Sequence, residues 1–295
     1  MTAATLHGRA EALASTLPPL LVEAERVAAV VAQGVHGRRR VGVGESFWQF
    51  RRYEPGDPVQ RIDWRQTAKR DQPFLRQLEW EAAQTVYLWR ATDGGFRWRS
   101  TKSTPTKADR AGLLLLALAS LLNSAGERVA LLDGDSPPGL GRADLSRLAM
   151  DLQRTEAGDD SPAAALPPNR AVQAHAAMVL FSDWLAPLPA IEAALASFQS
   201  KVEHGHLVQI LDPAEVDLPY AGRIRFSGFH NETALTLARV DTIRQAYQER
   251  IAAQQEGLRA LARAAGWQLH IHRTDQAPER ALLSVFQALA GAGAV

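Results

Sequence analysis

The sequence predicts an α/β fold: a doubly wound, mostly parallel sheet with helices on both faces. Short, continuously apolar runs such as residues 85–89 (TVYLW) and 176–182 (AAMVLFS) are typical of strands buried on both faces. Longer helical segments alternate with these runs, which is the order of a sheet built from strand–helix–strand units. The chain has 295 residues, 46% of them hydrophobic, enough for one full core and a smaller appendage.

The first expected element is a helix in the Ala-, Leu- and Val-rich stretch 10–33. Pro18-Pro19 divides it, because proline ends one helical piece and can open the next. Residues 47–53 and 73–80 alternate in polarity and are expected to form strands of a β-hairpin appendage. The α/β domain then begins, so we expect one domain over residues 1–80 and a second over residues 81–295.

The α/β domain contains a helix at residues 107–123 that is apolar nearly all round and must therefore be buried, with Gly126 placed to end it. Further strands are expected at residues 128–133, 207–211 and 267–272, with a possible edge strand at 224–226. Further helices are expected at residues 144–154, 191–204, 237–265 and 278–289.

Residues 44–69 (GESFWQFRRYEPGDPVQRIDWRQTAK) are not explained by an ordinary fold requirement. Pro55-Gly56 supplies the fixed and the permissive φ that the central positions of a type II turn require. Asp57 and Asp63 have arginines close on both sides, a pattern that favours charge-assisted Arg–carboxylate pairs. Two interpretations stay open: this cluster is a structural clamp, or it is an exposed recognition surface.

The same stretch resembles the signature of a bacterial family called "domain of unknown function 58". The family pattern is Arg-x-Tyr-x-Pro-Gly-Asp, then Arg-x-Ile-Asp-Trp, then a small and a basic residue. The residues that match it in order are Arg51, Tyr53, Pro55, Gly56, Asp57, Arg61, Ile62, Asp63, Trp64, Ala68 and Lys69. A second family pattern is matched by Asp212, Pro213, Glu215, Leu218, Pro219 and Gly222. The resemblance covers residues 35–290 and implies a von Willebrand factor A-like, Rossmann-type domain after the signature.

The A-like fold usually carries a metal-ion-dependent adhesion site at the carboxyl edge of its sheet, where hard oxygen ligands hold Mg²⁺. Alignment of the first strand places Ala91, Asp93 and Gly95 at the Asp-x-Ser-x-Ser positions, and none of the three matches. Asp183 does stand at the position of the later aspartate. We therefore expect a degenerate site without metal and no cofactor, unless Asp93 and Asp183 form a rearranged site.

Composition excludes several classes of function. The chain has no cysteine, which excludes disulfides, thiolate metal sites and cysteine nucleophiles. Its 33 basic and 32 acidic residues create no global field toward nucleic acid, so the arginines at 38–40 are interpreted as a solvated loop. The H-x-H pairs at 204/206 and 270/272 lack a third zinc ligand.

No membrane association is expected, because the longest apolar run, residues 111–122, is far below the roughly 20 residues of a spanning helix. The first residues do not read as a secretion signal, and we expect the protein to be cytoplasmic.

The resemblance implies a non-enzymatic protein-interaction module, because members of the family are commonly associated with MoxR-type AAA+ ATPases in chaperone-like complex assembly or maturation. Tryptophan and arginine are enriched at interface hot spots, so the signature is one expected contact surface. The loop residues Phe96, Arg97 and Trp98 are a second, unless Trp98 only packs under its own loop. The alternative is a metal-dependent hydrolase or nuclease that uses Asp57, Asp63 and Lys69.

Overall fold

A computed structural model describes residues 19–35, 47–52, 67, 73–78, 84–155, 162–228 and 234–292. The chain divides into two units, one of Met1–Gly37 with Gln84–Val295 and the other of Arg38–Ala83. The boundary before Gln84 lies close to the expected boundary at residue 81. The N-terminal helix differs from the expectation, because it belongs to the α/β unit and not with the hairpin.

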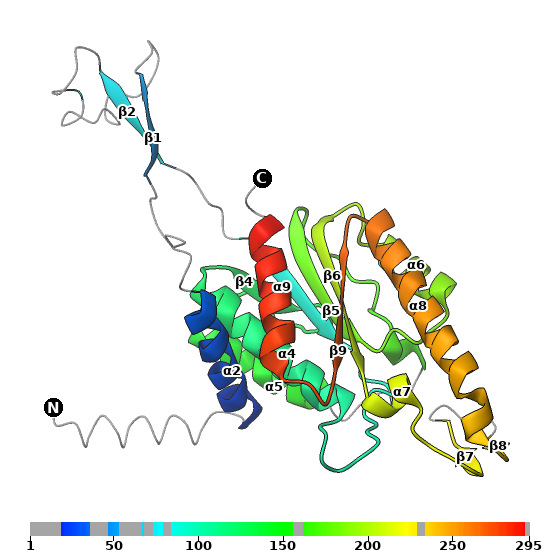
Figure 1. Ribbon diagram of the computed structural model, residues 1–295. Coiled ribbons are helices and arrows are strands. Elements are labelled where there is room, and N and C mark those ends of the chain that lie inside the picture. Colours follow the sequence, from blue (N-terminus) through cyan, green and yellow to red (C-terminus); the bar gives the residue numbers. More distant parts are fainter. Residues whose placement is uncertain are drawn as a thin grey trace, which may run out of the picture. The chain divides into compact units, whose positions relative to one another are not determined.

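The larger unit is built on a five-stranded sheet with the order β4-β3-β5-β6-β9, in which all neighbouring strands are parallel (Figure 1). The strands are β3 (Thr85–Arg90), β4 (Arg128–Leu131), β5 (Ala176–Ser182), β6 (Val202–Leu211) and β9 (Gln268–Arg273). The predicted α/β class with a parallel, doubly wound sheet is confirmed. The chain order reverses between β4 and β5, so the topological switch point lies at β3 and β5.

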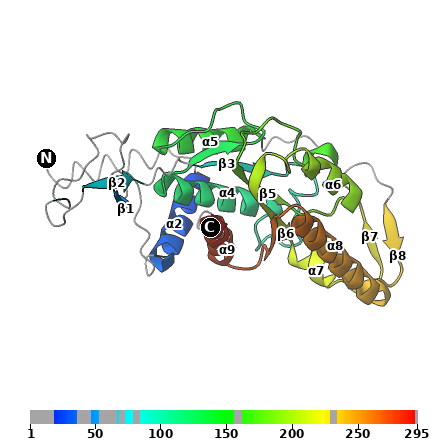
Figure 2. The ribbon, with the colours of Figure 1, turned by 90° about the horizontal axis from the view of Figure 1, so that it is seen from above.

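Helices cover both faces of this sheet (Figures 1 and 2). On one face α4 (Lys107–Ser124) and α9 (Pro278–Ala292) pack on the strands, and α2 (Pro19–Val35) lies against both helices. On the other face α8 (Arg244–Ala264) packs on β6 and β9, with α6 (Leu188–Ala196) against it. The remaining long helix, α5 (Arg142–Thr155), contacts α4 and α2.

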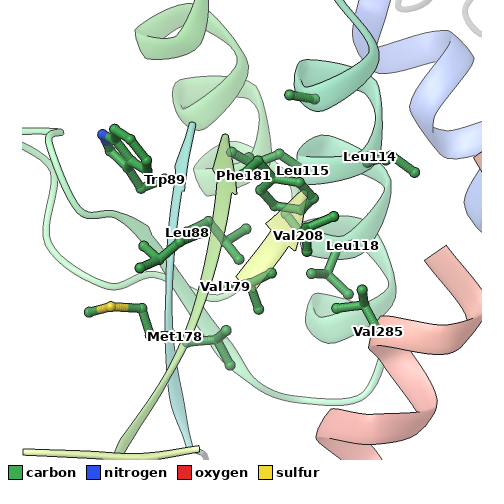
Figure 3. Packing of buried hydrophobic residues seen from close by; sticks show 14 of the residues in the cluster. Leu88, Trp89, Leu114, Leu115, Leu118, Met178, Val179, Phe181, Val208 and Val285 are labelled. Carbon is green, nitrogen blue, oxygen red and sulfur yellow. The ribbon is translucent and has the colours of Figure 1, made fainter. Parts of the chain in front are cut away.

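The core lies mainly between the sheet and α4. Leu115 and Leu118 of this helix are fully buried, and Figure 3 shows them beside Phe181 of β5 and Val208 of β6. Such burial stabilises each large apolar side chain by about 1.5–3 kcal/mol. Both faces of β5 are buried along its whole length, which explains its continuous apolar sequence.

The N-terminal helix joins the same core. Ala24, Val27, Ala28 and Val31 recur at helical spacing and are buried, so α2 has one apolar face and it packs on the α/β unit. This packing is the physical reason why the helix does not group with the hairpin. Among the described residues, no helix combines the length and the apolar character that crossing a bilayer requires.

Two sequence-based boundaries and one strand assignment were wrong. The helix expected at 191–204 ends at Ala196, and residues from Val202 onward extend β6, because they pair with β5 from Ala176. The helix expected from residue 237 begins at Arg244, after β8 (Leu235–Leu237) and a 3-10 turn, η3 (Val240–Ile243). The strand β7 (Ile224–Phe226) pairs with β8 in a separate antiparallel ribbon and is not an edge of the main sheet.

The smaller unit contains an antiparallel pair, β1 (Phe47–Arg52) and β2 (Phe74–Leu78), in which Phe50 lies opposite Arg76. The two strands are those expected from their alternating polarity. The register shifts between Phe47 and Gln49, which is consistent with a β-bulge. The expected turn at Pro55-Gly56 lies outside the described residues.

Candidate functional site

Acidic residues follow three neighbouring strands of the main sheet. Asp93 lies three residues beyond the end of β3, Asp183 directly follows β5, and Asp212 directly follows β6. Because the strands are parallel, their carboxyl ends meet at one edge of the sheet, which we call the carboxyl edge. Two of the three acids therefore belong to the topological switch point, where open α/β sheets bind ligands.

Lys107 brings a cation into this acidic edge. Its Nζ donates to Asp183 Oδ2 at 2.9 Å and to Glu215 Oε1 at 2.5 Å, and its side chain is 1% exposed. The lysine is the first residue of α4, after the N-cap Thr106 and its capping box with Asp109. We call Lys107, Asp183, Glu215 and Asp93 the lysine cluster.

The position of Lys107 is electrostatically unfavourable without these carboxylates. A cation in the first turn opposes the helix dipole, and burial removes its hydration. Burial lowers the pKa of the ammonium most strongly, yet attraction and hydrogen bonds from Asp183 and Glu215 more than offset this and raise the pKa above its ordinary value. The lysine therefore stays charged inside the protein.

Glu215 serves the cluster and a helix cap together. In the short helix α7 (Pro213–Asp217), Asp212 is the N-cap: its Oδ1 accepts from the N–H of Ala214 at 2.8 Å. Glu215 Oε2 accepts from the N–H of Asp212 at 2.9 Å, so the other oxygen is free for Lys107. The Asp-Pro-x-Glu pattern thus combines a capping box with a ligand for the buried ammonium.

The loop after β3 is fixed to the same cap. The N–H of Ser100 donates to Asp212 Oδ2 at 3.0 Å, over a sequence separation of 112 residues. Asp212 is fully buried, so both of its oxygens are used inside the protein. This carboxylate therefore connects the loop after β3 to the end of β6 at the carboxyl edge.

Asp183 is held by a strained turn. Trp184 has a φ of 54°, in the left-handed region that a bulky residue rarely adopts. Its indole Nε1 donates to the carbonyl of Val208 at 3.3 Å, and its ring lies 6.4 Å from that of Trp89. Asp183 Oδ1 accepts from the N–H of Leu185 at 3.2 Å, which leaves Oδ2 directed at Lys107.

Asp93 is the least satisfied member of the cluster. Its Oδ2 accepts from the N–H of Gly95 at 3.0 Å, but its Oδ1 is buried and has no hydrogen-bond partner in the described part of the chain. Burial raises the pKa of Asp93, with repulsion from Asp183 as the second cause, and the attraction of Lys107 is smaller. Burial also raises the pKa of Glu215 despite Lys107.

The positions expected for Mg²⁺ ligands do not fit such an ion. Ala91 is fully buried and its N–H donates to the carbonyl of Phe181 at 2.8 Å, while Gly95 offers only its backbone. Mg²⁺ demands near-octahedral oxygens at about 2.0–2.1 Å. Here an ammonium already lies between Asp183 and Glu215. Asp183 is thus at the expected edge, but its partner is a lysine.

The loop residues proposed as a contact surface have different environments. Phe96 is fully buried, and its carbonyl accepts from the N–H of Ala108 at the start of α4. It supports the helix start and cannot anchor a partner, contrary to the expectation. Arg97 and Trp98 are half-buried, which leaves part of each side chain accessible.

Most signature residues are not described. Arg51 lies in β1, opposite Leu75 of β2. The remaining signature and alternative catalytic residues lie outside the described residues: Tyr53, Pro55, Gly56, Asp57, Arg61, Asp63, Trp64 and Lys69. The Arg–carboxylate clamp and its alternative, a recognition surface, both stay predictions.

A second buried polar cluster lies between β6 and β9 on the face covered by α9. His206 Nδ1 and His270 Nε2 are 3.2 Å apart, and His270 Nδ1 is 3.0 Å from Ser284 Oγ of α9. With His272 we call this the histidine seam. Burial, then repulsion from His270 and His204, lowers the pKa of His206 to about 3. Burial, with Arg110 second, lowers the pKa of His272 to about 4.

The seam does not supply a zinc site. Within the ranges that the structure describes, no group of three or more His, Cys, Asp or Glu side chains could hold a metal ion. Among the described residues, the acids of the carboxyl edge do not form such a group either.

Sequence reasoning missed Lys107 as a site residue. A cation in a first helical turn opposes the helix dipole and is expected to be solvated, so Lys107 was not predicted to be buried. One signal was available: it begins a helix that is apolar nearly all round, where a charged side chain needs a partner. Glu215 was recognised as part of a family pattern without its role.

Comparisons with known proteins identify a family. The family described as "Protein of unknown function DUF58" matches residues 49–257. Uncharacterised proteins of Mycobacterium tuberculosis and Mycobacterium bovis are each 25% identical over 282 residues, covering 90% of this chain and 86% of the relative.

Among solved structures, BatB from Bacteroides thetaiotaomicron is similar with a TM-score of 0.38 and 11% identity, covering 72% of this chain and 100% of that one. An aerotolerance-related membrane protein from Bacteroides fragilis has a TM-score of 0.35 and 15% identity, covering 71% and 100%. A minor pilin, PilB, from Streptococcus sanguinis has a TM-score of 0.34 and 11% identity, covering 74% and 63%.

Proposed function

The chain belongs to the family described as "Protein of unknown function DUF58", and we propose that it is a non-enzymatic protein-interaction module. Its A-like domain presents a preassembled carboxyl edge to a protein partner. The partner we propose is a MoxR-type AAA+ ATPase in the cytoplasm, with a role in chaperone-like complex assembly or maturation.

The observation that supports this proposal most is the ion pairing of Lys107. A general acid or base needs a proton-active group that can reach substrate, and a metal site needs free oxygen ligands. Asp183 and Glu215 instead hold one buried ammonium, and Asp212 caps a helix. Asp183, Glu215 and Asp212 therefore have structural partners, and the edge suits recognition better than chemistry.

The contact surface we propose at this edge is formed by Arg97 and Trp98. Both are half-buried, and both follow Phe96, whose burial fixes the loop on the start of α4. A fixed loop loses little conformational entropy on binding, which increases affinity. Partly exposed arginine and tryptophan are the side chains that most often anchor an interface. The signature hairpin is the second proposed surface.

The test is binding of the purified chain to a MoxR-type ATPase from the same organism. We expect the double substitution Arg97→Ala with Trp98→Ala to weaken the affinity at least tenfold, since hot-spot residues contribute about 2 kcal/mol or more each. Circular dichroism and melting curves check that the variant folds. The matched control is Arg259→Ala, an exposed arginine on α8.

Unchanged binding by the folded double variant would remove the edge from the proposal and leave the hairpin. Absence of any binding, together with Mg²⁺-dependent cleavage of a nucleic acid that is lost in Asp63→Ala, would favour the hydrolase alternative.

A further inference from the structure

We infer that the outer side of β9 is a homodimer interface: a second copy of this chain pairs its own β9 with it, antiparallel and about a two-fold axis at His270. The two main sheets then form one continuous sheet across the axis. This inference does not rest on the proposed function, because it concerns an outer strand of the sheet and not the loops of the carboxyl edge.

The two outer strands of the main sheet differ in how their outer sides are used. The outer side of β4 is covered, because Val129 and Gly139 each donate a backbone N–H to the carbonyl of the other, at 2.9 and 3.1 Å. No described strand or isolated bridge occupies the outer side of β9. Within the described ranges, pairing with another sheet is therefore blocked at β4 and open at β9.

Backbone groups on the outer side of β9 follow a definite pattern. Just beyond the strand, Thr274 donates its N–H to the carbonyl of Leu211 in β6, at 3.0 Å. Successive residues of a strand direct their N–H and C=O groups to opposite sides, so His270 also faces β6, whereas Leu269 and Ile271 face outward. In the described part of the chain, the outward donors and acceptors of Leu269 and Ile271 have no strand to pair with.

This pattern is complementary to its own two-fold copy. When His270 lies opposite the same residue of a second copy, Leu269 of each chain lies opposite Ile271 of the other, and each such pair exchanges both backbone hydrogen bonds. The two apolar side chains then lie next to each other, on the face opposite the one where His270 contacts Ser284. The pairing covers Ile271, which is 39% exposed in the single chain.

β9 also lacks the features by which natural edge strands avoid such pairing. Its sequence, QLHIHR, has no lysine and no proline, and its pairing with β6 contains no register shift. Burial lowers the pKa of His270, so the residue on the axis is neutral near pH 7. Arg273 lies away from the axis and is paired with Asp217 and Asp275, at 2.9 and 3.1 Å. No like charges therefore meet where the two copies join, which favours a second copy as the occupant.

The decisive variant is Ile271→Pro. The N–H that it removes points outward, so the pairing with β6 is retained and the pairing on the outer side is weakened. Sedimentation equilibrium of the full native chain at about 100 µM should show a dimer, and Ile271→Pro should raise the dissociation constant at least tenfold. Circular dichroism and melting curves check that the variant folds.

A second variant keeps the backbone donor and adds a charge. Ile271→Lys places a lysine where natural edge strands carry one, so it should weaken the dimer as well. It carries the same comparison if Ile271→Pro does not fold. The matched control is Val30→Lys, at a 53% exposed position of α2, which should leave the dissociation constant unchanged.

Cross-linking tests the position of the axis. The chain has no cysteine of its own, so a single introduced cysteine can only react with its copy. Residues that face each other in a non-hydrogen-bonded antiparallel pair have Cα atoms about 4.5 Å apart, within the range of a disulfide. Mild oxidation with copper phenanthroline should therefore convert the His270→Cys variant to a covalent dimer and leave the control variant His175→Cys, at an exposed position, monomeric under denaturing conditions.

A native chain that is monomeric at about 100 µM would overturn the inference and leave the outer side of β9 to a strand of another protein. An unchanged dissociation constant for a folded Ile271→Pro or Ile271→Lys variant would also overturn it, since that result places the contact elsewhere. All these measurements use the chain alone, so they are independent of whether the ATPase binds.

Discussion

The lysine cluster and the histidine seam are both buried polar groups within one domain, yet they meet the cost of burial in opposite ways. Lys107 stays charged because two carboxylates contact it. His206 and His272 have no carboxylate among their hydrogen-bond partners in the described residues, and burial keeps them neutral. A buried group in this domain therefore remains ionised only where the fold supplies its counter-charge.

The largest expected effect is on the lysine cluster. Lys107→Met leaves the carboxylates of Asp183 and Glu215 buried without their cation, so we expect the free energy of unfolding to fall by about 3–5 kcal/mol. Urea denaturation measures this. Lys102, an exposed lysine in the loop before α4, provides the control. We expect Lys102→Met to change the free energy of unfolding by no more than about 0.5 kcal/mol. A loss below about 1 kcal/mol for Lys107→Met would mean that water reaches the cluster.

The seam should respond to acid. The folded-state pKa values of His206 and His272, about 3 and about 4, lie below the unfolded value of 6.5. Between pH 6.5 and these folded-state values, the two histidines bind protons in the unfolded chain but not in the folded protein. The free energy of unfolding therefore falls as the pH falls through this interval. Between pH 7 and pH 5 each histidine should cost about 2 kcal/mol.

His206→Gln tests this assignment. It should flatten the acid side of the curve of stability against pH, whereas substitution of the exposed His175 should leave that side unchanged. A native stability that is constant from pH 7 to pH 5 would contradict neutral burial. The stability contribution of the lysine cluster should depend on pH with the opposite sign. The pKa values of Asp93 and Glu215 are raised in the folded protein, so protonation on acidification relieves their unfavourable buried charge.

The smallest effect is expected at Asp93. Asp93→Asn removes a buried charge that Asp183 repels, while the amide oxygen can still accept from the N–H of Gly95. We expect a gain of up to about 1 kcal/mol in the free energy of unfolding at pH 7, measured by urea denaturation. A clear loss of stability would show that Lys107 needs all three carboxylates. Asp144→Asn, at a half-buried position of α5 where the carboxylate pairs with Arg147, serves as the comparison.

Much of the fold follows from local patterns. The continuous apolar runs predicted the bounds of β3 and β5 within one residue. A strand that is buried on both faces carries apolar side chains at nearly every position, so its sequence is recognisable by itself. The start of β6 was misjudged because Val202 is followed by two polar residues, Glu203 (exposed) and His204 (half-buried), which interrupt the apolar pattern. Its pairing with β5 decides that it is a strand, and pairing between distant segments is not visible in a local pattern.

The candidate site was likewise predictable only in part. The sequence indicated that Asp183 lies at the carboxyl edge, because it directly follows an apolar strand of a parallel sheet. Its partner was not predictable, because Lys107 is 76 residues from Asp183 and 108 residues from Glu215. A parallel sheet brings such remote segments to one edge, and the charge that meets each carboxylate depends on which loop and helix end there. The sequence therefore determined the acids of the edge, and the tertiary structure alone decided that their cation is a lysine.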